Sequence, residues 1–317
     1  MRVLVTGTSG FIGRWTCDML SSLLDDAEIV RAGRRVSPMC DVAVDLVNPE
    51  SVAALVDATR PDAVVHLAGI ASPAMARDNP AETFAVNAGA TALLAETLRA
   101  RCPEAHFVLA GSGLAYGATF FDHDGPVPES AALRPRDIYG ASKAAAEAAL
   151  SPSVEAGLRA TVLRFFNIVG PGQSTAYALP KFAAQIAAIE AGRAAPAVRT
   201  SRLDEGRDFV DVRDCARAIA SVISCRAATP GLVVFNIASG RSRIMGEVLR
   251  DMIALARVRI TVDEHPEEGP VGRALIARGD ACAIRAATGW RAETPWESTL
   301  RDMLDEHRAG AQSSAPQ

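Results

Sequence analysis

The sequence predicts an α/β protein in which a doubly wound parallel sheet of about seven strands is joined to a smaller C-terminal lobe. Three observations predict this fold. Short apolar segments rich in β-branched residues alternate with helical stretches along most of the chain, as in a parallel sheet covered by helices. The first apolar segment, residues 1–6, leads through a glycine-rich turn into a helical pattern. A strong helix-forming stretch begins later in the chain, behind Tyr139.

Composition excludes several classes of protein. Of the 317 residues, 49% are apolar, which suffices for a sizeable core. The net charge is 33 − 37 = −4, so we expect no nucleic-acid partner. No apolar run approaches the roughly 18 residues of a membrane span and no signal-peptide pattern is visible, so we expect no membrane partner and a cytoplasmic location. The six cysteines and five histidines lack ligand spacing, so we expect no metal.

The first strand is followed by the spacing Gly-x-x-Gly-x-x-Gly and a helix. Glycines let the backbone turn tightly and approach a pyrophosphate, and the helix N-terminus offers free amides and a positive dipole end. An ordinary strand-to-helix turn is the alternative. The pattern predicts a dinucleotide site formed by Gly7, Thr8, Ser9, Gly10, Phe11, Ile12 and Gly13.

The second strand, within residues 28–35, ends in two cations, Arg34 and Arg35. An acidic residue at this point binds the ribose 2′-hydroxyl of NAD, whereas an arginine accommodates the 2′-phosphate of NADP. The two arginines therefore favour NADP(H), with NAD(H) possible. A solvated basic loop is the alternative.

Tyr139 and Lys143 lie four residues apart on a predicted helix and so share one face. A free phenol has a pKa of about 10, and a fixed cation nearby lowers that value. The pair is therefore suited to proton exchange with an alcohol or a ketone. An isolated Tyr-x-x-x-Lys is a weak signal, because a buried aromatic beside a solvated lysine gives the same spacing.

Together, the glycine spacing and the Tyr-x-x-x-Lys about 130 residues later resemble the short-chain dehydrogenase/reductase superfamily, specifically its extended branch that acts on nucleotide-linked sugars. The resemblance covers nearly the whole chain and implies a Rossmann fold and a homodimer. It also implies that Ser112, in the turn Ser-x-x-x-Tyr-Gly, holds the carbonyl oxygen that is reduced. Gly113 and Leu114 stand where 4,6-dehydratases carry an Asp-Glu pair, which disfavours a dehydratase.

The resemblance assigns further residues to the cofactor. It places Asp45 and Leu46, at the end of the third strand, against the adenine ring. Asn87 is expected to be structural, because family members keep an asparagine for the central turn. His66 is expected to be a structural histidine at the end of the fourth strand. The small-residue turn Leu67, Ala68 and Gly69 lets the cofactor pass close to the sheet, and Phe166 lines the nicotinamide region together with Phe165.

Substrate contacts are implied in the same way. The stretch from Arg164 to Gln173 resembles the Arg-x-x-Asn-x-x-Gly-Pro-Gly-Gln of GDP-sugar-modifying members, and Arg207 stands where the family arginine pairs with the substrate diphosphate. The stretch 200–205 departs from the Gly-Asn-Leu pattern of GDP-sugar reductases, which puts guanine in doubt but not the diphosphate. The expected substrate residues are Ser72, Ser112, Asn167, Gln173, Lys181, Arg207 and Arg278, with Arg273 as an alternative to Arg278.

The expected organisation has two parts. Residues 1–170 with about 208–240 form the NADP-binding domain, about 171–207 and 241–310 form the substrate lobe, and 311–317 are a disordered tail. In the expected mechanism Tyr139 protonates the alkoxide, Lys143 lowers the pKa of Tyr139 and holds the nicotinamide ribose, and Ser112 polarises the carbonyl.

The expected reaction is NADPH-dependent reduction of the 4-keto group of a nucleotide-diphosphate 4-keto-6-deoxy sugar, and the chain looks most like GDP-4-keto-6-deoxy-D-mannose reductases. The product is then GDP-D-rhamnose or GDP-6-deoxy-D-talose. A 4-epimerase with tightly bound NAD is the alternative. A non-catalytic NADP-sensing protein is a more remote one.

Overall fold

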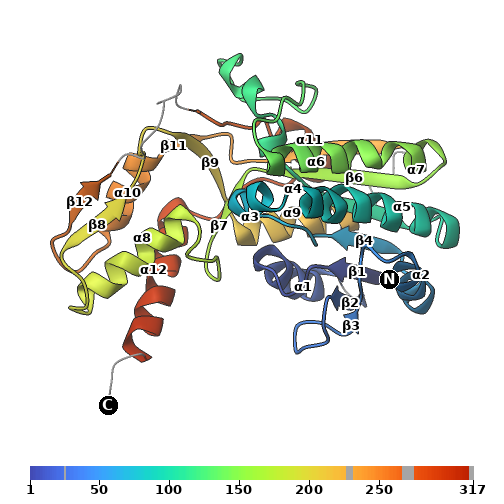
Figure 1. Cartoon of the computed structure of the whole chain (residues 1–317), viewed down its shortest axis with the longest axis horizontal. Helices are drawn as coiled ribbons and strands as arrows, with labels where there is room; N and C mark the ends of the chain where they lie inside the picture. Colours follow the sequence, from blue (N-terminus) through green and yellow to red (C-terminus); the bar gives the residue numbers. More distant parts are fainter. Residues whose placement is uncertain (25, 226–230, 266–274, 314–317) are drawn as a thin grey trace.

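The computed structural model describes residues 1–24, 26–225, 231–265 and 275–313. The chain has two parts: a central sheet with helices on both faces, and a smaller lobe built from C-terminal segments (Figure 1). None of the helices in these ranges has both the length and the apolar composition needed to cross a bilayer.

The central sheet has seven strands in the order β10-β6-β5-β4-β1-β2-β3, and every neighbouring pair is parallel. The strand order reverses between β1 and β4, and ligands of such sheets bind in the crevice at this point. The predicted doubly wound parallel sheet is confirmed. The strands are β1 (Arg2–Thr6), β2 (Glu28–Gly33), β3 (Val42–Ala43), β4 (Ala63–His66), β5 (His106–Ser112), β6 (Arg159–Phe165) and β10 (Leu232–Ile237).

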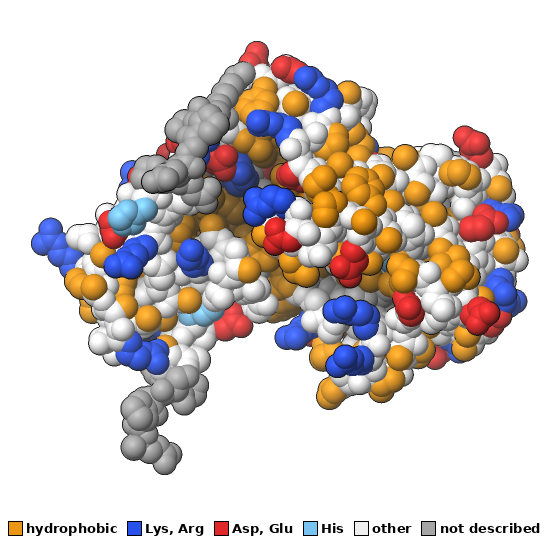
Figure 2. Space-filling model, viewed as in Figure 1, with side chains coloured by type: hydrophobic (Ala, Val, Ile, Leu, Met, Phe, Trp, Pro, Cys, Tyr) orange, Lys and Arg blue, Asp and Glu red, His pale blue; other side chains and the backbone are white. Residues whose placement is uncertain are grey.

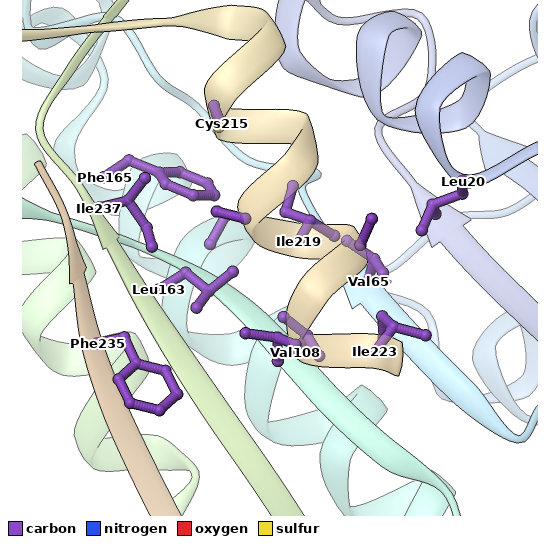
Figure 3. Packing of buried hydrophobic residues seen from close by; sticks show 14 of the residues in the cluster. Leu20, Val65, Val108, Leu163, Phe165, Cys215, Ile219, Ile223, Phe235 and Ile237 are labelled. Atoms are coloured by element: carbon purple, nitrogen blue, oxygen red, sulfur yellow. The ribbon is translucent and has the colours of Figure 1, made fainter. Parts of the chain in front are cut away.

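Two apolar cores hold the helices to the sheet. On one face α1 (Phe11–Leu23) and α9 (Val212–Ser224) pack over β1, β4, β5 and β6 (Figure 3). On the other face α2 (Pro49–Thr59), α5 (Ala90–Arg101) and α6 (Ile138–Ala149) enclose the second core. Because the central strands are buried on both faces, they read as nearly continuous apolar runs rather than as alternating ones.

The helix expected over residues 83–101 has a π-helical turn at its start. α4 (Pro80–Phe84) leads into the π-helix η1 (Ala85–Gly89), and α5 continues from it. π-turns inside helices are rare and often lie at functional sites. Short elements complete the surroundings of the strand ends: α3 (Pro73–Asp78), η2 (Gly113–Ala115), η3 (Ala118–Phe121) and α7 (Ser151–Glu155).

The lobe has its own core between helices and two small sheets. α8 (Ala178–Glu190), α10 (Met245–Ala254) and α12 (Trp296–Ser313) pack against the sheet β11-β9-β7. Its strands are β7 (Asn167–Val169), β9 (Gly206–Asp211) and β11 (Ser242–Ile244). A parallel pair, β8 (Ala197–Thr200) and β12 (Thr261–Glu264), forms the far edge.

One C-terminal segment lies elsewhere than expected. α11 (Cys282–Thr288) packs against β10, and Ile284 and Trp290 belong to the core between α1 and α9. The indole of Trp290 donates to the carbonyl of Asp214 at 2.9 Å. This segment therefore lies with the central sheet rather than with the lobe, because its apolar side chains complete that core. α12 continues to Ser313, and the rest of the expected tail, residues 314–317, lies outside the described residues.

Burial of His66 predicts an acid-sensitive fold. The ring is 1% exposed, its Nδ1 is 2.8 Å from the Thr6 hydroxyl, and its Nε2 has no partner among the described residues. Burial, and secondarily the charge of Lys143, lower its pKa from 6.5 to about 3. Between these values the unfolded chain binds a proton that the folded chain excludes, so stability falls as pH falls below 6.5.

We expect His66→Gln to remove about 1.6 kcal/mol of the stability difference between pH 6.5 and about pH 5. Urea unfolding of both proteins at the two pH values measures this. A variant whose stability changes with pH as steeply as that of wild type contradicts the assignment.

Candidate active site

The glycine-rich loop joins β1 to α1 and requires glycine at two positions. Gly7 has φ = 76°, and a Cβ there would lie 2.7 Å from the Ala68 nitrogen. A Cβ on Gly13 would lie 2.3 Å from the Gly7 oxygen. Gly7 thus lets the loop pack against the turn after β4, and Gly13 lets α1 pack against the loop. No side chain fits at either position, so the backbone is free to approach a pyrophosphate closely.

The start of α1 is open to an anion. Its N-cap, Gly10, provides no side-chain cap and the first turn has no acidic residue. By contrast, Asn48, Ser72, Asp137 and Asp211 accept amide hydrogen bonds at the starts of α2, α3, α6 and α9. The amides of α1 therefore fit a dinucleotide pyrophosphate. Of the other predicted loop residues, Ser9 is exposed, Phe11 and Ile12 are half-buried, and buried Thr8 donates to the carbonyl of Met39.

The loop after β2 carries two exposed arginines, and the nearby carboxylate of Asp41 is already bound by an arginine. Arg34 and Arg35 are both exposed. The nearby Asp41 is held by Arg31, which approaches its two oxygens at 2.5 and 3.0 Å and lowers the pKa of the carboxyl group. Because this carboxylate is engaged, the loop favours a 2′-phosphate over a 2′-hydroxyl.

The predicted adenine residues lie beyond β3. The exposed Asp45 accepts a hydrogen bond from the amide of Val47 at 3.1 Å, and Leu46 packs against the core beneath α2. Their contact with adenine stays a prediction.

The turn after β4 lies against α6. Leu67 and Ala68 are half-buried, and Gly69 is exposed. A Cβ on Gly69 would lie 2.8 Å from Asn87 Oδ1 and 3.6 Å from Lys143 Nζ. The small-residue turn therefore lies directly beside the lysine.

Asn87, in the π-turn, fixes this arrangement. Its amide accepts from the Ile70 nitrogen at 2.8 Å, donates to the Ile70 oxygen at 3.0 Å and donates to Ser142 Oγ at 2.9 Å. One buried side chain thus ties the turn after β4 to α6. The expectation that Asn87 is structural is confirmed.

Ser112, Tyr139 and Lys143 converge at the end of β5. Asp137 caps α6 by accepting from Gly140, and Lys143 Nζ donates to the carbonyl of Ala110 at 2.9 Å. Ser112, the last residue of β5, is 5% exposed; its Oγ accepts from the amide of Leu114 at 3.1 Å, and its hydroxyl is close enough to Tyr139 to lower the pKa of that phenol. The three predicted catalytic side chains are therefore brought together.

Burial shifts the pKa values of Tyr139 and Lys143. It raises the pKa of Tyr139 to about 12, and the Ser112 hydroxyl opposes this rise. That Lys143 lowers the pKa of Tyr139 stays a prediction. Burial also lowers the pKa of Lys143 to about 8, against the opposing charge of Glu147.

The Gly170–Gln173 turn brings the lobe to the glycine loop. Trp15 of α1 donates to the carbonyl of Pro171 at 3.0 Å. Gln173 donates to the carbonyl of Ile168 at 3.0 Å, while its buried Oε1 has no partner among the described residues. Asn167 begins β7 and is half-buried. The turn thus lies next to the start of α1, where a diphosphate-linked substrate would meet the cofactor.

Three of the remaining predicted substrate residues, Ser72, Arg207 and Arg278, have protein partners. Ser72 caps α3, and Lys181 is exposed on α8. Arg207 forms an ion pair with Glu205 and also bonds the carbonyl of Leu275 at 3.4 Å. Arg278 donates to the carbonyl of Asp124 at 3.4 Å, and Arg273 lies outside the described residues. Their contacts with substrate stay predictions.

Phe166 is buried in a small aromatic cluster. It is 7% exposed and packs near Tyr116 and Phe120. A Cβ on Gly113 would lie 3.1 Å from its ring. The ring therefore supports the turn after Ser112, and a contact of Phe166 with nicotinamide stays a prediction.

Sequence reasoning missed Tyr177, which immediately precedes α8. Its hydroxyl donates to the carbonyl of Ala71 at 3.4 Å, joining the lobe to the loop after β4. The space-filling view shows a hollow between the two parts of the molecule with basic side chains around it (Figure 2). We call this hollow the interdomain cleft. The contact between Tyr177 and Ala71 could not be predicted from the sequence, because a lone tyrosine four residues after Gln173 belongs to no recognisable motif.

Known proteins are similar to this chain in sequence and in fold. The NAD dependent epimerase/dehydratase family matches residues 3–238. The chain is 30% identical over 306 residues to GDP-6-deoxy-D-mannose reductase of Pseudomonas aeruginosa, covering 96% of each chain. It is 32% identical to dTDP-6-deoxy-L-talose 4-dehydrogenase (NAD(P)(+)) of Kitasatospora kifunensis, covering 99% of this chain and 96% of that one. The structure of RMD from Pseudomonas aeruginosa complexed with NADPH superposes with a TM-score of 0.84 at 29% identity, covering 98% and 99%.

The lowered pKa of Lys143 predicts a pH limit on cofactor binding. The side chain is an ammonium below about pH 8 and loses its charge above it. If the ammonium holds the cofactor, NADPH affinity should weaken about tenfold between about pH 7 and pH 9. Fluorescence titration with NADPH measures this. Lys143→Met serves as the control and should bind more weakly with no such pH dependence; a flat wild-type profile contradicts the assignment.

Proposed function

The chain belongs to the NAD dependent epimerase/dehydratase family, and from this premise we propose that it reduces the 4-keto group of a nucleotide-diphosphate 4-keto-6-deoxy sugar with NADPH. It is an NAD(P)H-dependent oxidoreductase acting on a sugar nucleotide. One observation carries the proposal: Ser112 at the end of β5 and the helix that carries Tyr139 and Lys143 meet beside the turn after β4, where Lys143 Nζ donates to the carbonyl of Ala110.

The side chains supply orientation and proton handling. Bound NADPH would supply the hydride. Ser112 donates a hydrogen bond to the ketone oxygen, and Tyr139 holds the proton that the developing alkoxide needs. Burial raises the pKa of Tyr139, so the phenol carries the proton that reduction needs. Lys143, fixed on Ala110, directs its remaining donors towards the turn after β4 and the ribose expected there.

The turn after Ser112 supports a reductase over a dehydratase. Gly113 and Leu114 carry no proton-transferring side chain. A Cβ on Gly113 would already lie 3.1 Å from the Phe166 ring, so an acidic side chain would require that ring to shift. Elimination of water needs an acid and a base at this point, and the chain offers neither there.

GDP is the nucleotide we propose for the substrate. The support is the similarity to the GDP-6-deoxy-D-mannose reductase and the position of the Gly170–Gln173 turn beside α1. The product is GDP-D-rhamnose or GDP-6-deoxy-D-talose, according to which face of the ketone is presented. Arg207 would exchange Glu205 for the substrate diphosphate, a ligand that suits a forked cation.

We further propose a homodimer in the cytoplasm. The outer side of α6 carries small, partly exposed residues at Ala144, Ala145 and Ala148, next to α5, which leaves room for close helix packing. All six cysteines are free, as expected in a reducing compartment. The mass of the particle in solution tests the homodimer, and cell fractionation tests the cytoplasmic location.

The reaction is tested by incubating the protein with NADPH and GDP-, dTDP- and UDP-linked 4-keto-6-deoxy sugars. We expect NADPH to be consumed in proportion to ketone, fastest with a GDP-sugar. Tyr139→Phe should lower kcat by about 10²- to 10⁴-fold and leave NADPH affinity unchanged. Interconversion of 4-epimers without added cofactor would instead identify an epimerase, and cofactor binding without any turnover would identify a sensor.

A second test concerns cofactor choice. Replacing both Arg34 and Arg35 with Ala should weaken NADPH by roughly 10- to 100-fold, because charge-assisted bonds to the 2′-phosphate are lost. NADH affinity should change little. Dissociation constants of NADPH and NADH, measured for wild type and for the double variant, test this prediction. An equal loss of affinity for NADH and NADPH contradicts the 2′-phosphate assignment.

A further inference from the structure

Tyr177 is a second phenol near the predicted active site, and it reaches from the lobe to the loop after β4. It stands at the N-cap of α8, and its hydroxyl reaches the carbonyl of Ala71 at 3.4 Å. These residues are separated by 106 positions and belong to the lobe and to the central domain, respectively. The side chain therefore connects the lobe to the loop after β4.

The attachment point of Tyr177 lies close to the reacting groups. Ala71 follows Ile70, whose backbone is held at 2.8 and 3.0 Å by Asn87. Two residues before Ala71 lies Gly69, where an added Cβ would lie 3.6 Å from Lys143 Nζ. Because Asn87 holds the residue before Ala71, the carbonyl that Tyr177 reaches lies on a fixed part of the loop beside the site.

The electrostatics agree with this placement. The Tyr177 phenol is one of the groups that raise the pKa of Tyr139, after burial. Burial raises the pKa of Tyr177 as well, so both phenols are neutral near pH 7. The hydroxyls of Ser112 and Tyr177 are thus both close enough to Tyr139 to affect its pKa. Each of the three can donate and accept a hydrogen bond.

The Tyr177–Ala71 bond is easily exchanged. Its length of 3.4 Å is at the weak end for a hydroxyl donor, and Tyr177 is 37% exposed. A ligand hydroxyl could take the place of the Ala71 carbonyl without leaving a buried group unpaired. Such a side chain contributes little to holding the two parts of the molecule together.

We propose that Tyr177 is a substrate-binding residue that hydrogen-bonds a ring hydroxyl of the sugar next to the reacting carbon and thereby selects which face of the ketone meets the hydride. The inference rests on the proposed function and extends it to the stereochemistry of the product. A neutral donor and acceptor suits a sugar hydroxyl, whereas a phosphate would call for a cation.

The test is Tyr177→Phe, which removes one oxygen and keeps the ring. We expect KM for the sugar nucleotide to rise roughly 3- to 10-fold, NADPH affinity to stay unchanged, and the product to become a mixture of C4 epimers by NMR. Ser174→Ala removes a hydroxyl from the same exposed turn and is the matched control, with kinetics and product like wild type. Thermal unfolding of the variants verifies that they are folded.

A second readout does not depend on turnover. The chain has three tyrosines, so phenolate absorbance during alkaline titration can be assigned with Tyr139→Phe and Tyr177→Phe. Loss of the Tyr177 hydroxyl should lower the titration midpoint of Tyr139. Unchanged KM, product and titration overturn the inference while the reductase stands. If wild type reduces no 4-keto sugar, the proposed function fails and this inference fails with it, even if the titration shows that the phenols are neighbours.

Discussion

The buried ammonium of Lys143 is the constraint on which the site depends. Removing a cation from water costs on the order of several kcal/mol unless partners compensate. Here the carbonyl of Ala110 lies at 2.9 Å and the Glu147 carboxylate follows one helical turn later. Because Ala110 belongs to the central strand β5, the bond fixes how α6 lies on the sheet. That orientation places Tyr139 beside Ser112 and turns the helix towards the loop after β4.

A second buried charge supports this helix from behind. Glu147 accepts from Arg164 at 2.8 Å, and Arg164 also donates to the hydroxyl of Tyr116 at 2.7 Å. Burial raises the pKa of Glu147, and the Arg164 guanidinium opposes the rise. The pair joins α6 to β6, so the lysine and the tyrosine are held by two neighbouring strands. A site that must position a hydride donor and a ketone needs such rigidity.

Much of this could be predicted from the sequence, because it depends on local pattern. The glycine loop, the parallel sheet implied by alternating elements, and the helix carrying Tyr139 and Lys143 are all indicated by patterns among residues close in the chain. Features that depend on packing between residues far apart in the chain could not be predicted. The pKa of Tyr139 rises because the folded chain buries it, the α11 segment returns to the central core, and Tyr177 meets a loop 106 residues away. None of these leaves a periodic signal.

The account is tested most directly by an experimental structure of the NADPH complex. It predicts the pyrophosphate at the start of α1, the 2′-phosphate between Arg34 and Arg35, and the nicotinamide ring within contact of Tyr139, with the Lys143 ammonium on its ribose. A cofactor bound with the nicotinamide away from Tyr139, or with Lys143 still bonded only to Ala110, would contradict it.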